Sequence, residues 1–224
     1  WFYIMSSELK KRIITSICLF ILLILMFVYT YILIISLTII GIITWIEFYG
    51  LIIKIFKKKT YKEKFLRFLY KSISLIYLSS LIYLIVFTKL IKPELFIIIM
   101  CIISVSIMTD IGGLFIGRIF KGKKLTKISP KKTISGSLGS FAFSLFLIPL
   151  FIQNLSNYDF FILSVIIILI SLTSQIGDLL ISFLKRKAKV KNTSDLLPGH
   201  GGILDRVDGI IFSIPVGFLL LNIF

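Results

Sequence analysis

Residues 158–181 read YDFFILSVIIILISLTSQIGDLLI and form one of the longest apolar runs of the chain. A helix needs about 20 predominantly apolar residues to cross the hydrocarbon layer of a bilayer, and this run is long enough. The whole chain of 224 residues is 58% hydrophobic and has a mean hydropathy of +1.04. Such values lie outside the range of soluble globular proteins. The sequence therefore predicts an integral membrane protein.

Six further runs have approximately the length of a membrane span, at 13–29, 31–53, 72–91, 95–117, 134–152 and 204–224. Strands of a membrane barrel would alternate between apolar and polar residues, and these runs do not. We therefore expect an all-α fold, a polytopic bundle of about seven transmembrane helices.

The positions of the basic residues support this division of the chain. Of the 26 lysine and arginine residues, all but Lys89 and Lys92 lie in the N-terminus or in the segments 54–71, 118–132 and 182–207. Basic segments thus alternate with nearly uncharged ones, as the positive-inside rule requires if the N-terminus is cytoplasmic. The polar loops 118–133 and 182–207 then share the cytoplasmic face. This topology, together with anionic lipid headgroups, explains the net charge of +16 without a nucleic-acid partner.

Residues 182–209, SFLKRKAKVKNTSDLLPGHGGILDRVDG, interrupt the apolar pattern directly after the run 158–181. Their turn at 198–202 contains three glycines and the only histidine, His200. Such a turn lets backbone amides approach a ligand closely. Asp205 and Asp208 are three residues apart, so a helix would place both carboxylates on one face as candidate ligands of a divalent cation.

Asp178 lies within an apolar run, where a carboxylate costs roughly 2.5–3.5 kcal/mol on insertion scales unless it faces a polar partner or cavity. Together with Ser174, Ser182 and Lys185 it forms a stripe at helical spacing that leads into the polar stretch. The alternative is a stripe that only packs against another helix through hydrogen bonds.

Two other acids lie within apolar runs. Asp110 precedes Gly113 and Gly117, a small-residue pair that close helix packing explains, although packing does not explain the aspartate. Glu47 has no comparable neighbours, so we expect a structural partner for it, such as a lysine of the basic loop.

The loop 121–136, KGKKLTKISPKKTISG, precedes the run 134–152. A helix N-terminus with nearby cations and hydroxyls suits phosphate oxygens, but the spacing is not that of a Walker A loop. A loop that only sets topology is an equal alternative. His200, between glycines and two acids, is a further candidate for binding phosphate. The phosphate-binding candidates in this loop are Ser129, Lys131, Lys132 and Thr133.

These motifs together resemble the phosphatidate cytidylyltransferase family, also called CDP-diacylglycerol synthases. The signature of that family contains a serine, a Lys-Arg pair, a lysine, a PGHGG turn and an LDRxD end, which correspond here to Ser182, Lys185 and Arg186, Lys191, 198–202 and 204–208. The resemblance covers about residues 104–213. Asn192 and Ser135 depart from the family, which usually has aspartate and often glutamate at these places; either change could weaken a hydrogen bond or a charge.

The resemblance implies transfer of a cytidylyl group from CTP to phosphatidate, with Mg²⁺ as cofactor and a second, monovalent cation left open. It places N-terminal spans at 1–100 and a catalytic region at 101–224, in the inner membrane of a bacterial cell with the site facing the cytoplasm; a homodimer is compatible with it. The implied metal ligands are Asp178, Asp205 and Asp208, and the other implied catalytic residues are Lys185, Arg186, His200 and Arg206. The implied substrate contacts are Asp110, Ser129, Lys131, Lys132, Thr133, Ser182, Gly201 and Gly202.

Other functions stay open at this point. A transporter would use Glu47, Asp110 and Asp178 as an ion relay, but its acids should spread across the bilayer, whereas most acids here gather on one side. A lipid-binding scaffold would need only the basic loops. Another membrane phosphotransferase, such as one that uses a CDP-alcohol, is nearer, although its acidic signature has a different spacing.

Overall fold

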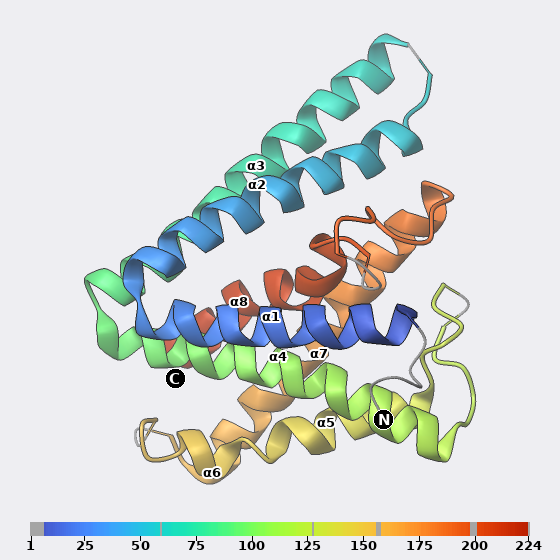
Figure 1. Ribbon diagram of the computed structural model, residues 1–224. Helices are drawn as coiled ribbons and strands as arrows, with labels where there is room; N and C mark the ends of the chain where they lie inside the picture. Colours follow the sequence, from blue (N-terminus) through green and yellow to red (C-terminus); the bar gives the residue numbers. More distant parts are fainter. Residues whose placement is uncertain (1–6, 59, 127, 156–157, 198–200, 224) are drawn as a thin grey trace. The chain divides into compact units, whose positions relative to one another are not determined.

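The computed structural model describes residues 7–58, 60–126, 128–155, 158–197 and 201–223. These residues form helices without any strand, apart from isolated bridges between Lys124 and Thr133 and between Leu197 and Gly201. The predicted all-α class is confirmed. The helices in the described ranges are α1 (Ser7–Val28), α2 (Thr30–Ile55), α3 (Tyr61–Leu90), α4 (Pro93–Phe120), α5 (Ile134–Leu145), α6 (Ile148–Phe151), α7 (Phe160–Lys187) and α8 (Leu204–Ile223) (Figure 1).

Five helical segments of the described chain are long and apolar enough to cross a bilayer. They are α2, α3, α4, α7 and the segment Ile134–Phe151, and they match five of the predicted runs. The run 13–29 gives only the shorter apolar stretch Ile13–Val28, and the run 204–224 forms α8, which is not among the five. Seven spans and a cytoplasmic N-terminus stay predictions.

Several helices extend past the apolar runs. The α3 helix begins at Tyr61 rather than near residue 72, and α7 continues to Lys187 rather than ending near 181. Lysine, arginine and glutamate are good helix formers, and their long side chains can carry the charge into water. The run 134–152 is interrupted instead, since α5 ends at Leu145 and Pro149 has no N–H to donate to the preceding turn.

The chain forms two compact units. Unit 1 comprises residues up to Leu90 together with Leu184–Arg206, and unit 2 comprises Ile91–Phe183 together with Val207–Phe224. Much of the polar stretch that precedes α8 therefore packs with the N-terminal helices. The predicted division into N-terminal spans at 1–100 and a catalytic region at 101–224 stays a prediction.

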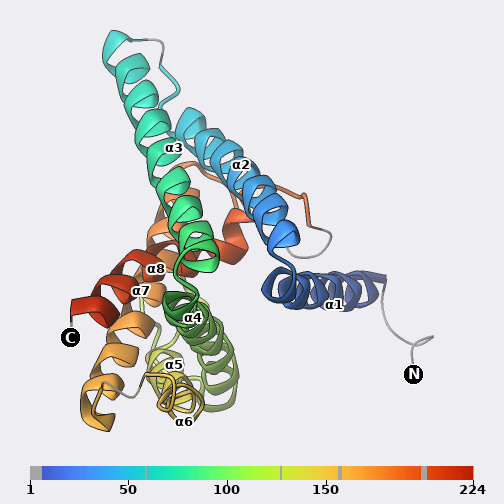
Figure 2. The same ribbon diagram turned by 90° about the vertical axis from the view of Figure 1, so that its left-hand side faces the viewer.

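In unit 1, α2 and α3 lie side by side (Figures 1 and 2). The indole nitrogen of Trp45 donates to the carbonyl of Lys71 at 3.1 Å, and the Lys71 ammonium lies 5.2 and 5.0 Å from the ring centroids of Trp45 and Tyr49. The other end of α3 is tied to α1, because Lys89 donates to the carbonyl of Phe27 at 2.9 Å. These contacts fix α2, the helix that carries Glu47.

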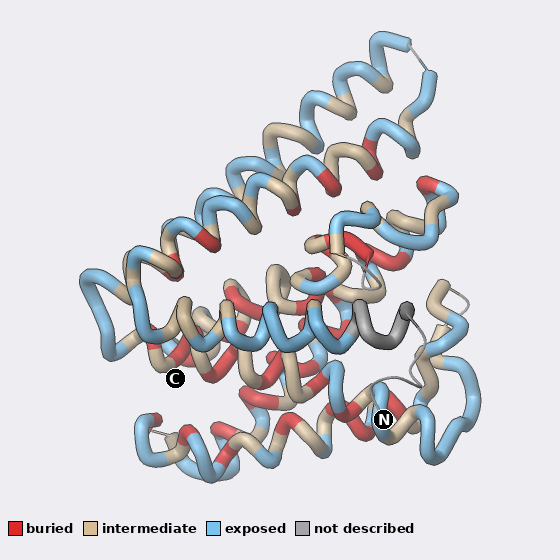
Figure 3. Tube along the Cα trace, in the orientation of Figure 1, coloured by how far each residue is buried: buried red, intermediate tan, exposed pale blue. Residues whose placement is uncertain are grey.

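The core of unit 2 involves α4, α7 and α8. Thr109 of α4 donates to Ser171 of α7 at 2.8 Å, and Ser106 of α4 shares a hydrogen bond of 2.6 Å with Ser213 of α8. These buried hydroxyls join the helices where water has no access. Figure 3 marks buried residues in red, and the fully buried apolar side chains of α4 and α7 include Ile99, Ile102, Val105, Leu163, Ile167 and Ile170.

Glycines bring α4 against α5. A Cβ atom at Gly112 would lie 2.6 Å from the carbonyl oxygen of Gly139, and one at Gly136 would lie 2.7 Å from that of Gly113. A Cβ atom at Gly117 would lie 3.0 Å from the Thr133 hydroxyl. The predicted packing role of Gly113 and Gly117 is confirmed, and α5 is the partner. This packing holds the loop before α5 beside the C-terminal half of α4.

Candidate active site

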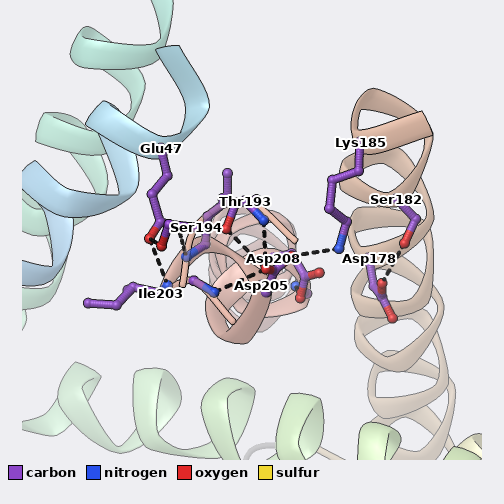
Figure 4. Close-up of polar contacts among 12 residues, drawn as sticks. Glu47, Asp178, Ser182, Lys185, Thr193, Ser194, Ile203, Asp205 and Asp208 are labelled. Carbon is purple, nitrogen blue, oxygen red and sulfur yellow. Dashed lines mark hydrogen bonds and ion pairs between the residues drawn. The ribbon is translucent and has the colours of Figure 1, made fainter. Parts of the chain in front are cut away.

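The polar cluster of unit 1 is built around Glu47 of α2 (Figure 4). Its Oε1 atom accepts from the Ser194 hydroxyl at 2.6 Å and the Ile203 amide at 3.1 Å. Its Oε2 atom accepts from the Thr193 hydroxyl and the Leu204 amide, both at 2.8 Å. The expectation of a lysine partner for Glu47 is wrong, because hydroxyls and amides of 193–204 satisfy this carboxylate instead.

Asp205, in the first turn of α8, is the second carboxylate of unit 1. Its Oδ1 atom accepts from the Lys185 ammonium at 2.5 Å, and its Oδ2 atom accepts from the amides of Thr193 and Gly202 at 2.9 and 3.1 Å. Burial alone would raise the pKa of Asp205, but the hydrogen bond from Lys185, the two amides and the lysine charge hold it below its ordinary value. The charged form is therefore favoured.

One hydroxyl joins the two carboxylates. The Thr193 Oγ1 atom lies 2.8 Å from Glu47 Oε2 and 3.0 Å from Asp205 Oδ2. A hydroxyl has a single proton to donate, so at any moment Thr193 donates its hydroxyl hydrogen bond to one of the two carboxylates. We refer to Glu47, Asp205, Lys185, Thr193, Ser194 and the amides of 202–204 as the carboxylate cluster.

Two glycines make the carboxylate cluster sterically possible. Gly201 has a φ of +84°, in the left-handed region that favours glycine. A Cβ atom at Gly202 would meet both the Thr193 hydroxyl and the Glu47 carboxylate. The Gly201 amide donates to Leu197 and the Gly202 amide to Asp205, so the predicted contacts of these amides with substrate stay predictions. His200, Pro198 and Gly199 lie outside the described residues.

A separate polar cluster lies in unit 2, where Lys132 forms an ion pair with Asp178 of α7. The Ser182 hydroxyl donates to the other carboxylate oxygen of Asp178 at 3.3 Å (Figure 4). Lys132 belongs to the loop that leads into α5. The structure thus brings Lys132 of the loop 121–136 together with Asp178 and Ser182 of the polar stripe, two motifs that the sequence analysis selected separately.

The last predicted metal ligand, Asp208, is buried in unit 2. It lies where α7 and α8 cross closely, because a Cβ atom at Gly177 would be 2.7 Å from the carbonyl oxygen of Asp208. One turn earlier on α7, the Ser174 hydroxyl would meet a Cβ atom at Gly209. Asp208 and the residue next to Asp178 are therefore neighbours at one helix crossing.

Gln175, which the sequence analysis did not select, lies on the same part of α7 as Ser174 of the polar stripe. Gln175 accepts a hydrogen bond of 2.6 Å from Ser137 of α5. Its Nε2 atom and the Ser174 hydroxyl are buried without a hydrogen-bond partner among the described residues. A buried polar group without a partner costs about 1–3 kcal/mol. The sequence did carry a signal for Gln175, because this polar residue lies inside an apolar run three residues before Asp178.

The three predicted ligands Asp178, Asp205 and Asp208 offer carboxylate oxygens, the hard ligands that Mg²⁺ prefers. All three already accept protein donors, on both oxygens of Asp178 and of Asp205 and on Oδ1 of Asp208, which accepts from the Gly209 amide at 2.9 Å. Within the described part of the chain, no group of three or more His, Cys, Asp or Glu side chains is arranged to hold a metal ion. Magnesium binding stays a prediction.

The other predicted residues are distributed over both units. Thr133 caps α5, since its hydroxyl accepts from the Gly136 amide at 3.1 Å. Ser135, which departs from the resembled pattern, lies 3.0 Å from the Thr133 hydroxyl and donates to the carbonyl of Lys121 at 2.7 Å. Ser129 is partly buried, and the exposed members of the predicted set are Asp110, Lys131, Arg186 and Arg206. Their roles toward substrate are not tested by these contacts.

Comparisons with known proteins point to one family. The chain matches the family described as the cytidylyltransferase family over residues 1–224. A phosphatidate cytidylyltransferase of Rickettsia felis is 44% identical over 131 residues, which cover 54% of this chain and 55% of the relative. One of Bacillus subtilis is 40% identical over 119 residues, covering 52% of this chain and 44% of the relative.

A third relative, the phosphatidate cytidylyltransferase of Rickettsia prowazekii, is 38% identical over 168 residues. That match covers 69% of this chain and 71% of the relative. The chain spans about half the length of the first two curated relatives that it matches.

Proposed function

The chain belongs to the cytidylyltransferase family, and from this premise we propose that it transfers a cytidylyl group from CTP to phosphatidate. The products would be CDP-diacylglycerol and pyrophosphate. Three relatives carry the name phosphatidate cytidylyltransferase. The structural observation that supports the proposal most directly is the ion pair between Lys132 and Asp178. It brings a cation suited to phosphate and a carboxylate suited to a metal ion to one point of unit 2.

The reaction needs little covalent chemistry from the protein. A phosphate oxygen of phosphatidate attacks the α-phosphorus of CTP, and a new O–P bond forms. The bond from that phosphorus to the oxygen bridging to the β-phosphate breaks, and pyrophosphate leaves with the electron pair. The attacking phosphate is already anionic at pH 7, so no general base is required. Positioning and charge stabilisation carry such reactions.

Each polar cluster is given its own role here. Lys132 would donate to phosphate oxygens of CTP, and Asp178 and Asp208 would hold Mg²⁺. When bound, Mg²⁺ neutralises charge on the triphosphate oxygens. We assign a positioning role to Asp205 of unit 1, because Lys185, Thr193 and Gly202 hold it within the carboxylate cluster. The exposed Arg186 and Arg206 of unit 1 would contact anionic substrate groups.

The location of the site follows from the two substrates. Phosphatidate must arrive from the bilayer, and CTP is water-soluble. The basic segments 118–132 and 182–207 would meet CTP on the cytoplasmic side of a bacterial inner membrane. The relay that a transporter would require receives no support, since Glu47 is held by four donors of the same unit.

The test uses the purified chain in micelles that contain phosphatidate, with Mg²⁺ and CTP labelled at either the α- or the γ-phosphate. Cytidylyl transfer moves the α-label into a lipid-soluble product and leaves the γ-label in pyrophosphate. Transfer of the γ-label to lipid would indicate a phosphotransferase of another kind. Replacing phosphatidate by diacylglycerol should abolish the product, because the nucleophilic phosphate is missing. A folded chain that labels no lipid would refute the proposal.

A further inference from the structure

Glu47 lies outside every motif that the sequence analysis assigned to catalysis, yet four donors from 193–204 converge on it. We propose that Glu47 is a positioning residue of the cytidylyltransferase reaction. It fastens the C-terminal polar stretch to α2 and thereby sets the position of Asp205 and Lys185. This inference rests on the proposed function above.

Glu47 is buried. Its exposed fraction is 6%, although it lies in an apolar helix long enough to span a membrane. A carboxylate in such a place is unfavourable unless its lone pairs are satisfied. Each of the Glu47 oxygens accepts one hydroxyl and one backbone amide. The carboxylate is therefore bound to the polar stretch through both of its oxygens, with the Thr193 hydroxyl shared between Glu47 and Asp205.

Glu47 also supplies the acceptors at the start of α8. The first amides of a helix have no acceptor within the helix itself. Here the amides of Ile203 and Leu204 donate to Glu47, which comes from a different helix. A negative charge at this place is also favoured by the helix dipole. Glu47 thus fixes where α8 begins, immediately before Asp205.

Thr193 links Glu47 to Asp205. Its hydroxyl contacts both Glu47 and Asp205, and its amide donates to Asp205. Asp205 in turn holds the Lys185 ammonium. A change at Glu47 therefore reaches Lys185 through groups that are in direct contact. The small size of Gly202 is what allows the loop to close on Glu47.

The geometry predicts different effects for two substitutions. In Glu47→Gln, one oxygen becomes an NH₂ group, and at either position that group faces a backbone amide that needs an acceptor. In Glu47→Asp, both acceptor oxygens and the charge stay, but the side chain is shorter by one methylene group. Glutamine should therefore disrupt the start of α8 more than aspartate does.

The experiment measures kcat and KM for CTP per folded molecule in the labelled-CTP assay. Glu47→Gln should lower kcat about tenfold or more, and Glu47→Asp should recover part of the loss. Glu94→Gln, at an exposed glutamate of unit 2, is the matched control and should leave kcat unchanged. A purely structural role would lower the yield of folded protein and leave kcat per folded molecule unchanged, which would overturn the proposal.

A double-mutant cycle with Thr193→Val tests the path of the effect. Because both substitutions act on the carboxylate cluster, their combined loss of kcat should be clearly smaller than the product of the single losses. Independent, multiplying losses would contradict the link through Thr193.

Hydrogen exchange separates this inference from the proposed function. Glu47→Gln should speed amide exchange at 201–206 relative to wild type and to Glu94→Gln, whether or not the chain shows activity. If wild type labels no lipid, the proposed function fails, and the catalytic part of the inference fails with it. If exchange at 201–206 is unchanged in an active protein, the inference about Glu47 fails alone.

Discussion

The chain contains two ion pairs of the same chemical type in very different surroundings. In unit 1, the side chains of Lys185 and Asp205 are 13% and 10% exposed, and the remaining acceptor positions of Asp205 are filled by Thr193 and Gly202. In unit 2, the side chains of Lys132 and Asp178 are 28% and 25% exposed, and within the described part of the chain only the Ser182 hydroxyl adds a hydrogen bond to Asp178. A buried ion pair whose acceptor oxygens are all occupied is suited to stabilising the fold. A more exposed pair can more readily exchange a partner for a ligand.

The largest expected effect lies on the open side of this comparison. Asp178→Asn removes the negative charge that pairs with Lys132 and that we propose binds Mg²⁺. CDP-diacylglycerol formation should therefore fall by about 100-fold or more. The melting temperature should change little, because water can reach this pair. Asp195→Asn, at an exposed acid of the polar stretch, is the control and should keep wild-type turnover. Turnover of Asp178→Asn at the wild-type rate would remove this residue from the mechanism.

The second prediction concerns stability, for which the buried pair of unit 1 should matter more than the exposed pair of unit 2. Lys185→Met leaves the Asp205 carboxylate buried without its cation, which should cost about 3 kcal/mol of unfolding free energy. Lys132→Met should cost much less, since solvent can replace the ammonium at Asp178. Denaturant or thermal unfolding of the two variants in one detergent measures the difference. Equal losses would mean that burial does not distinguish the pairs.

A third prediction tests the steric closure of the carboxylate cluster. Gly202→Ala inserts a Cβ atom against Thr193 and Glu47 and should destabilise the protein by about 2 kcal/mol, the usual range for overpacking. Gly50→Ala is the matched control in α2, because a Cβ atom there meets nothing within 4 Å. That control should be neutral or slightly stabilising. The paired melting temperatures decide between the two outcomes, and a Gly202→Ala variant as stable as Gly50→Ala would be incompatible with the described contact.

The smallest effect is expected for an uncharged pair. Ser106 and Ser213 share a hydrogen bond in the core of unit 2, and hydrogen bonds between membrane helices average about 0.6 kcal/mol. A double-mutant cycle of Ser106→Ala and Ser213→Ala, read by unfolding, should give a coupling of that size. A coupling as large as that of Lys185 and Asp205 would show that the charge of a pair matters less than its burial.

The sequence predicted more of unit 2 than of unit 1. Asp178 was an acid in an apolar run, Ser182 lay one turn further along the same helical stripe, and Lys132 was a basic residue before a helix; the structure brings the three together. Glu47 carried the signal of an acid in an apolar run, but its partners were misjudged. Thr193 and Ser194 carried none, because hydroxyls in a polar stretch are ordinary.

The sequence by itself determined that the chain forms apolar membrane helices and determined its family resemblance, because span length and motif spacing are properties of neighbouring residues. Tertiary structure alone decided which donors satisfy each carboxylate. The hydrogen bond from Thr193 to Glu47 joins residues 146 positions apart. Such partners are chosen by the packing of helices and by the need to satisfy buried charge, and no local pattern records that choice.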